Sequence, residues 1–259
     1  MCTADCRSGC RCRSGYKRSS SGDCVLTCYV LGRPFSLEKG GFLVAPVMSS
    51  PSITIQEVVA VPENASTFEP IIPEPDRNKA AQYWAKVAMM EHASVASFSR
   101  FSLELMSIGA PVDLLSGAHQ AALDEVRHTQ VSLDIANQFG STNFTPGSFP
   151  ISREAADFAF GDVEKIAEAA ALEGCIEETL AAAVVFEQAR VMQIPSLKAQ
   201  IRSVGLDEAN HAAFAWRAVQ WMTSTFPQTQ QVVAKVFADR AAKYKDTPDN
   251  TAAPSTSSA

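Results

Sequence analysis

Two short segments of the chain, LDEVRH and LDEANH, each place a glutamate three residues before a histidine. The chain has only four histidines, and these two repeats contain two of them. Residues three apart lie on one face of a helix, so Glu125 can act together with His128, and Glu208 with His211. A carboxylate oxygen beside an imidazole nitrogen is a ligand pair that iron and manganese accept. The repeat therefore indicates a metal site built from two helices.

A centre for two metal ions needs more negative charge than two carboxylates supply. Helical bundles that bind two iron ions use one further glutamate from each of two other helices. The helical run before the first repeat offers Glu91, on an apolar face where a carboxylate without a partner is costly to bury. The run before the second repeat offers Glu173, Glu177 and Glu178.

The two halves of the chain can be compared to choose among these three glutamates. Glu91 lies fifteen residues before Met106, at the first short loop, and Glu178 lies fourteen residues before Met192, at the second. This match favours Glu178. Glu173 lies more than a turn too early, and the residue before Glu178 faces about 100° away from it. We therefore expect Glu178 to be the ligand, with Glu173 and its neighbour Glu177 as open alternatives.

The repeats lie within a long helical part of the sequence. Apolar residues recur every three to four positions, as they do along one face of a helix. We expect helices over residues 78–108, 111–138, 162–193, 195–226 and 229–245. Short loops join the first helix to the second and the third to the fourth, whereas about twenty residues separate the second from the third. Two short hairpins with one long crossover are typical of a ferritin-like four-helix bundle.

Residues 78–225 resemble the ferritin-like di-iron carboxylate superfamily. The resemblance rests on the segments EHASVASFSRFSLELMSIGAP, ALDEVRH, EGCIEETLAA and DEANHAAFAWR, which are similar to a group of bacterial-type ferritin-like domain proteins of largely unknown role. It implies an all-α fold: a ferritin-like bundle with one long crossover and an extra C-terminal helix. It also implies two bound iron ions, with manganese as the alternative. The implied ligands are Glu91, Glu125, His128, Glu178, Glu208 and His211, with Glu125 and either Glu178 or Glu91 expected to bridge.

The function implied by this resemblance is that of a non-haem di-iron or di-manganese carboxylate protein. We expect an oxidoreductase or oxygenase that activates dioxygen or peroxide and acts with a small substrate or electron donor that the sequence does not identify. One alternative is a ferroxidase or metal-handling protein without an organic substrate. Another is a metal-free helical scaffold whose Cys-rich module binds a partner.

Several residues near the repeats have two possible roles. Asp124 and Asp207 each precede a glutamate of a repeat, and each either faces solvent or accepts a hydrogen bond from the histidine of the opposite helix. His92 is expected to pack or to support a ligand, and His119 to lie at the surface. Cys175 is expected to be a small buried hydrophobic residue. We expect four aromatic residues in the core: Tyr83, Trp84, Trp216 and Trp221.

Six of the seven cysteines lie in the first 28 residues, in a segment too polar to bury a core. This segment resembles the C-terminal half of trypsin-inhibitor-like and EGF-like modules, which implies disulfides. A zinc cluster is less consistent with the spacing, because there is no C-x2-C pair and no nearby histidine. The resemblance favours an extracellular or cell-surface protein whose signal sequence lies upstream; without one, we expect a cytoplasmic protein.

Composition limits the partners and the division into domains. The net charge of -6 gives no basic surface for nucleic acid, and no apolar run reaches the length of a membrane span. The sequence does not indicate the oligomeric state.

The chain divides into four predicted parts. We expect a Cys-rich module over 1–28, short strands and a Pro-rich linker over 29–76, a helical bundle over 77–245 and a disordered tail over 246–259.

Overall fold

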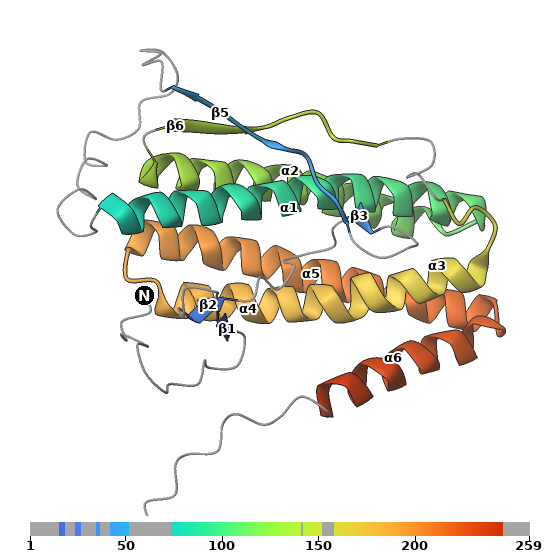
Figure 1. Cartoon of the computed structure of the whole chain (residues 1–259). Helices are drawn as coiled ribbons and strands as arrows, with labels where there is room; N and C mark the ends of the chain where they lie inside the picture. Colours follow the sequence, from blue (N-terminus) through green and yellow to red (C-terminus); the bar gives the residue numbers. More distant parts are fainter. Residues whose placement is uncertain are drawn as a thin grey trace, which may run out of the picture. The chain divides into compact units, whose positions relative to one another are not determined.

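The computed structural model is mainly helical, which confirms the all-α fold class (Figure 1). It describes residues 16–18, 24–26, 35–36, 42–51, 74–140, 142–151 and 158–245. Of the N-terminal cysteines predicted to form disulfides, all but Cys24 lie outside these residues, and so does the predicted tail over 246–259. Within the described residues, no helix is both long enough and apolar enough to cross a membrane.

The chain divides into two units, which are described separately. The smaller unit comprises residues 1–29 and 234–259, and the larger comprises residues 30–233. In the smaller unit, β1 (Tyr16–Arg18) pairs antiparallel with β2 (Cys24–Leu26). Helix α6 (Thr229–Lys245) begins in the larger unit and continues into the smaller one. All residues discussed below belong to the larger unit.

The larger unit contains the long helices. They are α1 (Glu74–Ser107), α2 (Val112–Phe139), α3 (Val163–Ala169), the π-helix η1 (Ala170–Glu177), α4 (Glu178–Val191) and α5 (Pro195–Thr225). Helix α1 packs along α2, whereas η1 and α4 pack along α5, and α2 also contacts α5. Figure 1 shows α1 and α2 lying next to each other, with α5 and the α3–η1–α4 segment beneath them.

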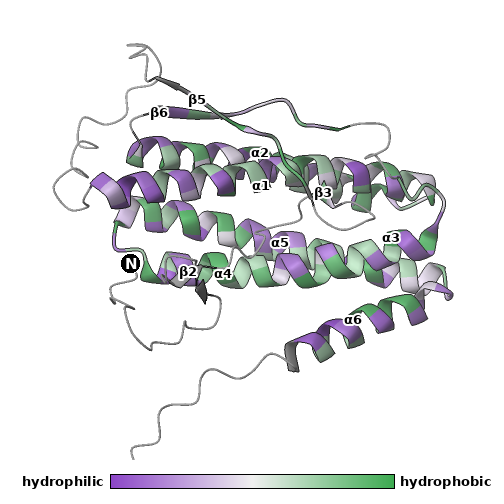
Figure 2. Ribbon diagram, in the orientation of Figure 1, coloured by the Kyte–Doolittle hydropathy of each residue, from purple (hydrophilic) through white to green (hydrophobic). Residues whose placement is uncertain are grey.

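The helices bury one side each. Figure 2 shows polar and apolar residues alternating along them, as expected for amphipathic helices. Phe98, Phe101 and Leu105 of α1 are at most 1 % exposed, and so is Ile135 of α2. The prediction for the aromatic residues was wrong for Trp216, which is 48 % exposed. The other three, Tyr83, Trp84 and Trp221, are half-buried.

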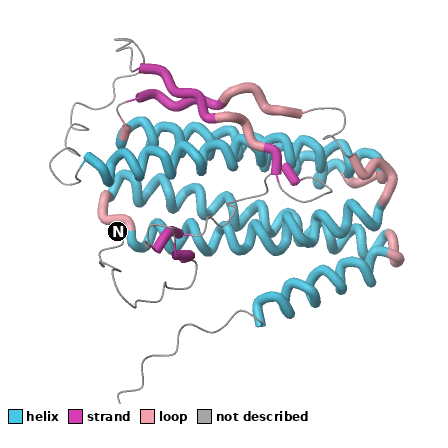
Figure 3. Tube along the Cα trace, viewed as in Figure 1, coloured by secondary structure: helices cyan, strands magenta, loops and turns pink. Residues whose placement is uncertain are grey.

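Two antiparallel strand pairs accompany the helices (Figure 3). Strands β3 (Phe35–Ser36) and β4 (Phe42–Leu43) pair antiparallel, within the segment 29–76 for which short strands are predicted. Strand β5 (Val47–Pro51) pairs with β6 (Thr142–Pro146), which lies in the connection between α2 and α3. The sequence did not predict β6. Its partner is distant in the chain, and prolines and glycines around it are typical of a loop.

The segment that precedes Glu178 is a π-helix rather than part of one continuous α-helix. The hydroxyl of Thr179 donates a hydrogen bond to the carbonyl of Cys175, 2.6 Å away, at the end of this segment. Single π turns inside α-helices occur often at functional sites. Here the π-helix leads directly to the first residue of α4, Glu178.

Helices α4 and α5 approach each other closely at Gly205. A Cβ atom at this position would lie 3.1 Å from the ring of Phe186 and 3.2 Å from a methyl of Val185. A residue with a side chain would therefore require these neighbours to shift. The absence of a side chain at Gly205 allows the two helices to pack at their present distance.

Candidate metal centre

Six buried side chains converge where the long helices meet. All six residues are at most 2 % exposed. They come from four helices: Glu91 from α1, Glu125 and His128 from α2, Glu178 from α4, and Glu208 and His211 from α5. These are the six residues selected from the sequence, and the structure brings all of them together.

The six residues form two overlapping groups of four, each able to hold one metal ion. The first group is Glu91, Glu125, His128 and Glu208; the second is Glu125, Glu178, Glu208 and His211. In each group the potential ligand atoms lie within 4.8 Å of one another. The groups share Glu125 and Glu208. This arrangement differs from the expected bridging by Glu125 with Glu178 or Glu91, because each of those last two residues belongs to one group only.

The two shared glutamates each direct one oxygen towards each histidine. His128 Nδ1 lies 3.2 Å from one oxygen of Glu208 and 3.6 Å from one oxygen of Glu125. His211 Nδ1 lies 3.2 Å from the other oxygen of Glu125 and 3.6 Å from the other oxygen of Glu208. Each shared carboxylate therefore spans both groups, as a bridging ligand must.

These close atoms do not form hydrogen bonds with one another. Both oxygens of Glu125, Glu178 and Glu208 are buried without a hydrogen-bond partner, and so are Nδ1 of His128 and Nδ1 of His211. Buried polar atoms without partners cost free energy. Buried nitrogen and oxygen atoms that converge without hydrogen-bond partners fit a bound cation, to which they can donate their lone pairs. The donor set suits iron or manganese, and two divalent ions would neutralise the four carboxylates.

Without a cation, the centre retains protons. Burial raises the pKa of Glu91 well above its usual value, and the carboxylates of Glu125 and Glu208 raise it further. Burial and the Glu208 carboxylate likewise raise the pKa of Glu178. Burial lowers the pKa of His128, but the close carboxylates of the two shared glutamates outweigh this effect and raise it to about 9.

The second histidine behaves in the same way. Burial lowers the pKa of His211, and the two shared glutamates raise it to about 12. Protons thus balance part of the buried negative charge at neutral pH. Metal ions and protons compete for the same atoms.

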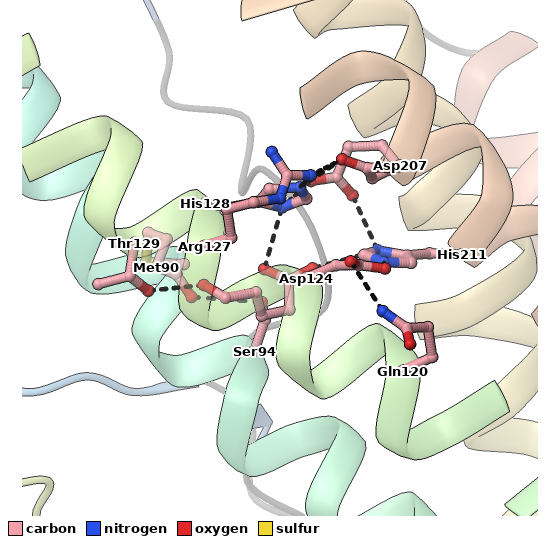
Figure 4. Close-up of polar contacts among 11 residues, drawn as sticks. Met90, Ser94, Gln120, Asp124, Arg127, His128, Thr129, Asp207 and His211 are labelled. Carbon is pink, nitrogen blue, oxygen red and sulfur yellow. Dashed lines mark hydrogen bonds and ion pairs between the residues drawn. The ribbon is translucent and has the colours of Figure 1, made fainter. Parts of the chain in front are cut away.

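Two aspartates support the histidines from outside the centre (Figure 4). His128 Nε2 lies 3.3 Å from an oxygen of Asp207, and His211 Nε2 lies 3.4 Å from an oxygen of Asp124. Each aspartate therefore contacts the histidine of the opposite repeat, which confirms the predicted cross-helix bond. An ionised carboxylate only accepts hydrogen bonds, so Nε2 carries a proton and Nδ1 faces the centre, where its lone pair would be free for a cation once the ring is neutral.

The aspartates have partners of their own. Arg127 forms an ion pair with Asp207, and the amide of Gln120 donates a hydrogen bond to Asp124 over 3.2 Å. One aspartate thus contacts a neutral amide of its own helix, and the other contacts a guanidinium of the opposite helix.

Removing either supporting aspartate should weaken metal binding. We expect Asp124→Ala or Asp207→Ala to lower metal affinity by about 10- to 100-fold, because the histidine loses the group that fixes its tautomer and orientation. Asp134→Ala is the matched control, since Asp134 also accepts a bond from a glutamine one turn earlier but lies away from the centre. Titration with Mn²⁺ measures the effect. Equal weakening by the Asp134 variant would contradict the assigned role.

The rejected candidates on the third predicted helix lie elsewhere. Glu173 is buried, but it pairs with Arg100 at 3.2 Å and belongs to neither group. Arg100 also lies 3.8 Å from Glu104 and donates a hydrogen bond to the carbonyl of Ser36. This network joins α1, η1 and β3. The network was not predicted from the sequence, although a lone arginine on the apolar face of the first helix is a signal of a buried ion pair.

The remaining predicted residues also lie outside the two groups. Glu177 is half-buried. His92 is half-buried, and its ring packs edge-on against Phe149. His119 is exposed, as predicted, with Nε2 3.0 Å from the hydroxyl of Ser102. Cys175 is buried, also as predicted.

Known proteins provide no independent assignment of this centre. Comparison of the chain with protein-family models, with curated proteins and with solved structures finds no match.

Proposed function

We propose that this protein is a non-haem carboxylate protein that holds two iron or two manganese ions and uses them to oxidise a small substrate with dioxygen or peroxide. The observation that carries the proposal is the pair of overlapping groups, in which buried carboxylate oxygens and imidazole nitrogens converge without hydrogen-bond partners. A purely structural cluster of buried acids would be expected to have counter-ions or hydrogen bonds in these positions.

We further propose that the larger unit is a ferritin-like four-helix bundle. The α1–α2 pair and the pairing of η1 and α4 with α5 support this proposal, and so does the long connection between α2 and α3. Such bundles take one glutamate from each of two helices and Glu-x-x-His from each of the other two. The four helices that supply the six side chains follow that rule.

In this proposal each side chain has a defined task. Glu91 and His128 would hold one ion, Glu178 and His211 would hold the other, and Glu125 and Glu208 would contribute to both positions. When bound, the two ions supply electrons and open coordination positions for an oxygen-based oxidant. The chain keeps the ligand atoms buried and therefore away from bulk water. Asp124 and Asp207 hold the proton on the outer nitrogen of each histidine.

Metal analysis of the purified full chain tests the proposal most directly. We expect two iron or two manganese ions per chain after loading without oxygen and removal of excess metal. Mixing the iron-loaded protein with dioxygen should then produce an absorbance change from iron oxidation. A protein that retains no iron or manganese would contradict the proposal and would favour a helical scaffold.

The same sample separates an oxygenase from a ferroxidase. An oxygenase or oxidase keeps its two ions through repeated cycles of reduction and oxidation, and a suitable small organic molecule is consumed with them. A ferroxidase instead turns over many added Fe²⁺ ions per chain. Multiple turnover of Fe²⁺ alone would therefore replace the first function by the second.

A further inference from the structure

A narrow cavity lies beside the candidate metal centre, along the axis of the larger unit. Its walls are mainly apolar and come from four helices: Val87 of α1, Val131 and Ile135 of α2, Val185 of α4, and Ile201 and Val204 of α5. At one end it reaches Glu91, one of the six residues of the centre. It therefore leads to the group that contains Glu91 and His128.

The opposite end of the cavity lies near Trp84 and Gln188. Seven residues separate Trp84 from Glu91 along α1, which corresponds to about 10 Å of helix. The amide of Gln188 donates a hydrogen bond to the hydroxyl of Tyr83, 2.9 Å away, and joins α4 to α1. Tyr83, Trp84 and Gln188 are half-buried, so this end lies nearer to solvent than Glu91 does.

The size and chemistry of the cavity limit what can occupy it. It has room for about one water-sized molecule. A buried water needs two to four polar partners, and between its two ends the wall offers only the hydroxyl of Ser132. A hydrated cation would lose its water shell without receiving replacement ligands in this cavity. Small apolar molecules, by contrast, enter dry apolar cavities readily.

We propose that this cavity binds one dioxygen molecule beside Glu91, next to the centre. The proposal rests on the proposed function for its purpose, but gas binding in the cavity does not require bound metal. Neither His128 nor His211 borders the cavity, so dioxygen lies on the side of a glutamate.

Dissolved dioxygen is paramagnetic, and its position can be measured by nuclear magnetic resonance. The sample is the metal-free full chain with labelled valine, isoleucine and leucine methyl groups, under dioxygen and under nitrogen at equal pressure. We expect the methyls of Ile135 and Val204 to relax at least about twofold faster under dioxygen than those of Leu105, because gases concentrate in apolar cavities. Leu105 is buried, as Ile135 and Val204 are, but it does not border the cavity.

A filled cavity gives the matched control. Val204→Ile adds one methylene to the wall, and Val131→Phe adds a ring at a half-buried position. Either variant should reduce the dioxygen effect at Ile135 towards that at Leu105. Equal relaxation at cavity and control methyls in the unaltered protein would overturn the proposal without affecting the metal centre. The protein could also show dioxygen enriched in the cavity but retain no iron or manganese in the metal analysis. That result would overturn the proposed function and would still support dioxygen binding in the cavity.

Discussion

We expect Glu125→Ala to abolish binding of both metal ions and Glu91→Ala to leave one ion bound. This expected difference follows from the geometry, because Glu125 belongs to both groups of four residues and Glu91 to one. Removing a shared carboxylate takes one ligand and one negative charge from each position at once. Removing Glu91 leaves the group that contains Glu178 and His211 intact. Metal content after removal of excess ions measures both results.

The alternatives left open by the sequence provide the controls for this experiment. Glu177→Ala and Glu173→Gln should each retain two ions, since neither residue belongs to a group of ligands. Glutamine is preferred at Glu173 because it preserves the volume beside Arg100. Two ions retained by the Glu125 variant, or a loss of metal in the Glu177 variant, would show that the six residues are wrongly assigned.

Metal affinity should fall steeply as the pH is lowered. The metal-free centre holds protons at neutral pH, because the pKa values of Glu91 and Glu178 are raised well above their usual range and those of His128 and His211 are raised to about 9 and about 12. The ligands must lose these protons to bind metal. The metal-loaded state therefore binds fewer protons than the metal-free state, and affinity rises with pH.

Between pH 8 and pH 6 we expect the affinity for Mn²⁺ to decrease at least about 100-fold, which corresponds to at least one proton released per ion bound. Calorimetric titration in two buffers with different ionisation enthalpies counts the protons. The same titration of the Asp134→Ala variant should give the same count as the unaltered chain. Affinity that is equal at the two pH values would contradict the proton competition.

The helices and the six residues could be predicted because both depend on local patterns. Apolar residues at helical spacing located α1, α2 and α5 within a few residues of their observed bounds. The repeated Glu-x-x-His placed each carboxylate beside its histidine. The choice of Glu178 over Glu173 followed from comparing distances to two loops, and the structure places Glu178 among the six.

The features that were missed depend on contacts between distant parts of the chain. The rotation of each helix about its axis determines which two glutamates belong to both groups. The spacing of residues along one helix does not reveal this rotation. The partner of Glu173 is Arg100 of another helix. The pairing of β5 with β6 joins segments on either side of α1 and α2. The π-helix before Glu178 has the same local composition as an α-helix.

Gly205 connects helix packing to the electronic behaviour of a loaded centre. It lies one turn before Glu208 on α5, and its missing side chain lets the ring of Phe186 on α4 come close. The gap between α4 and α5 sets the span from Glu178 to Glu208 and His211. Two paramagnetic ions bridged by carboxylates couple their spins with a strength that depends on their separation. In a loaded centre, a residue without a side chain would thus influence the exchange coupling between the ions through helix packing alone.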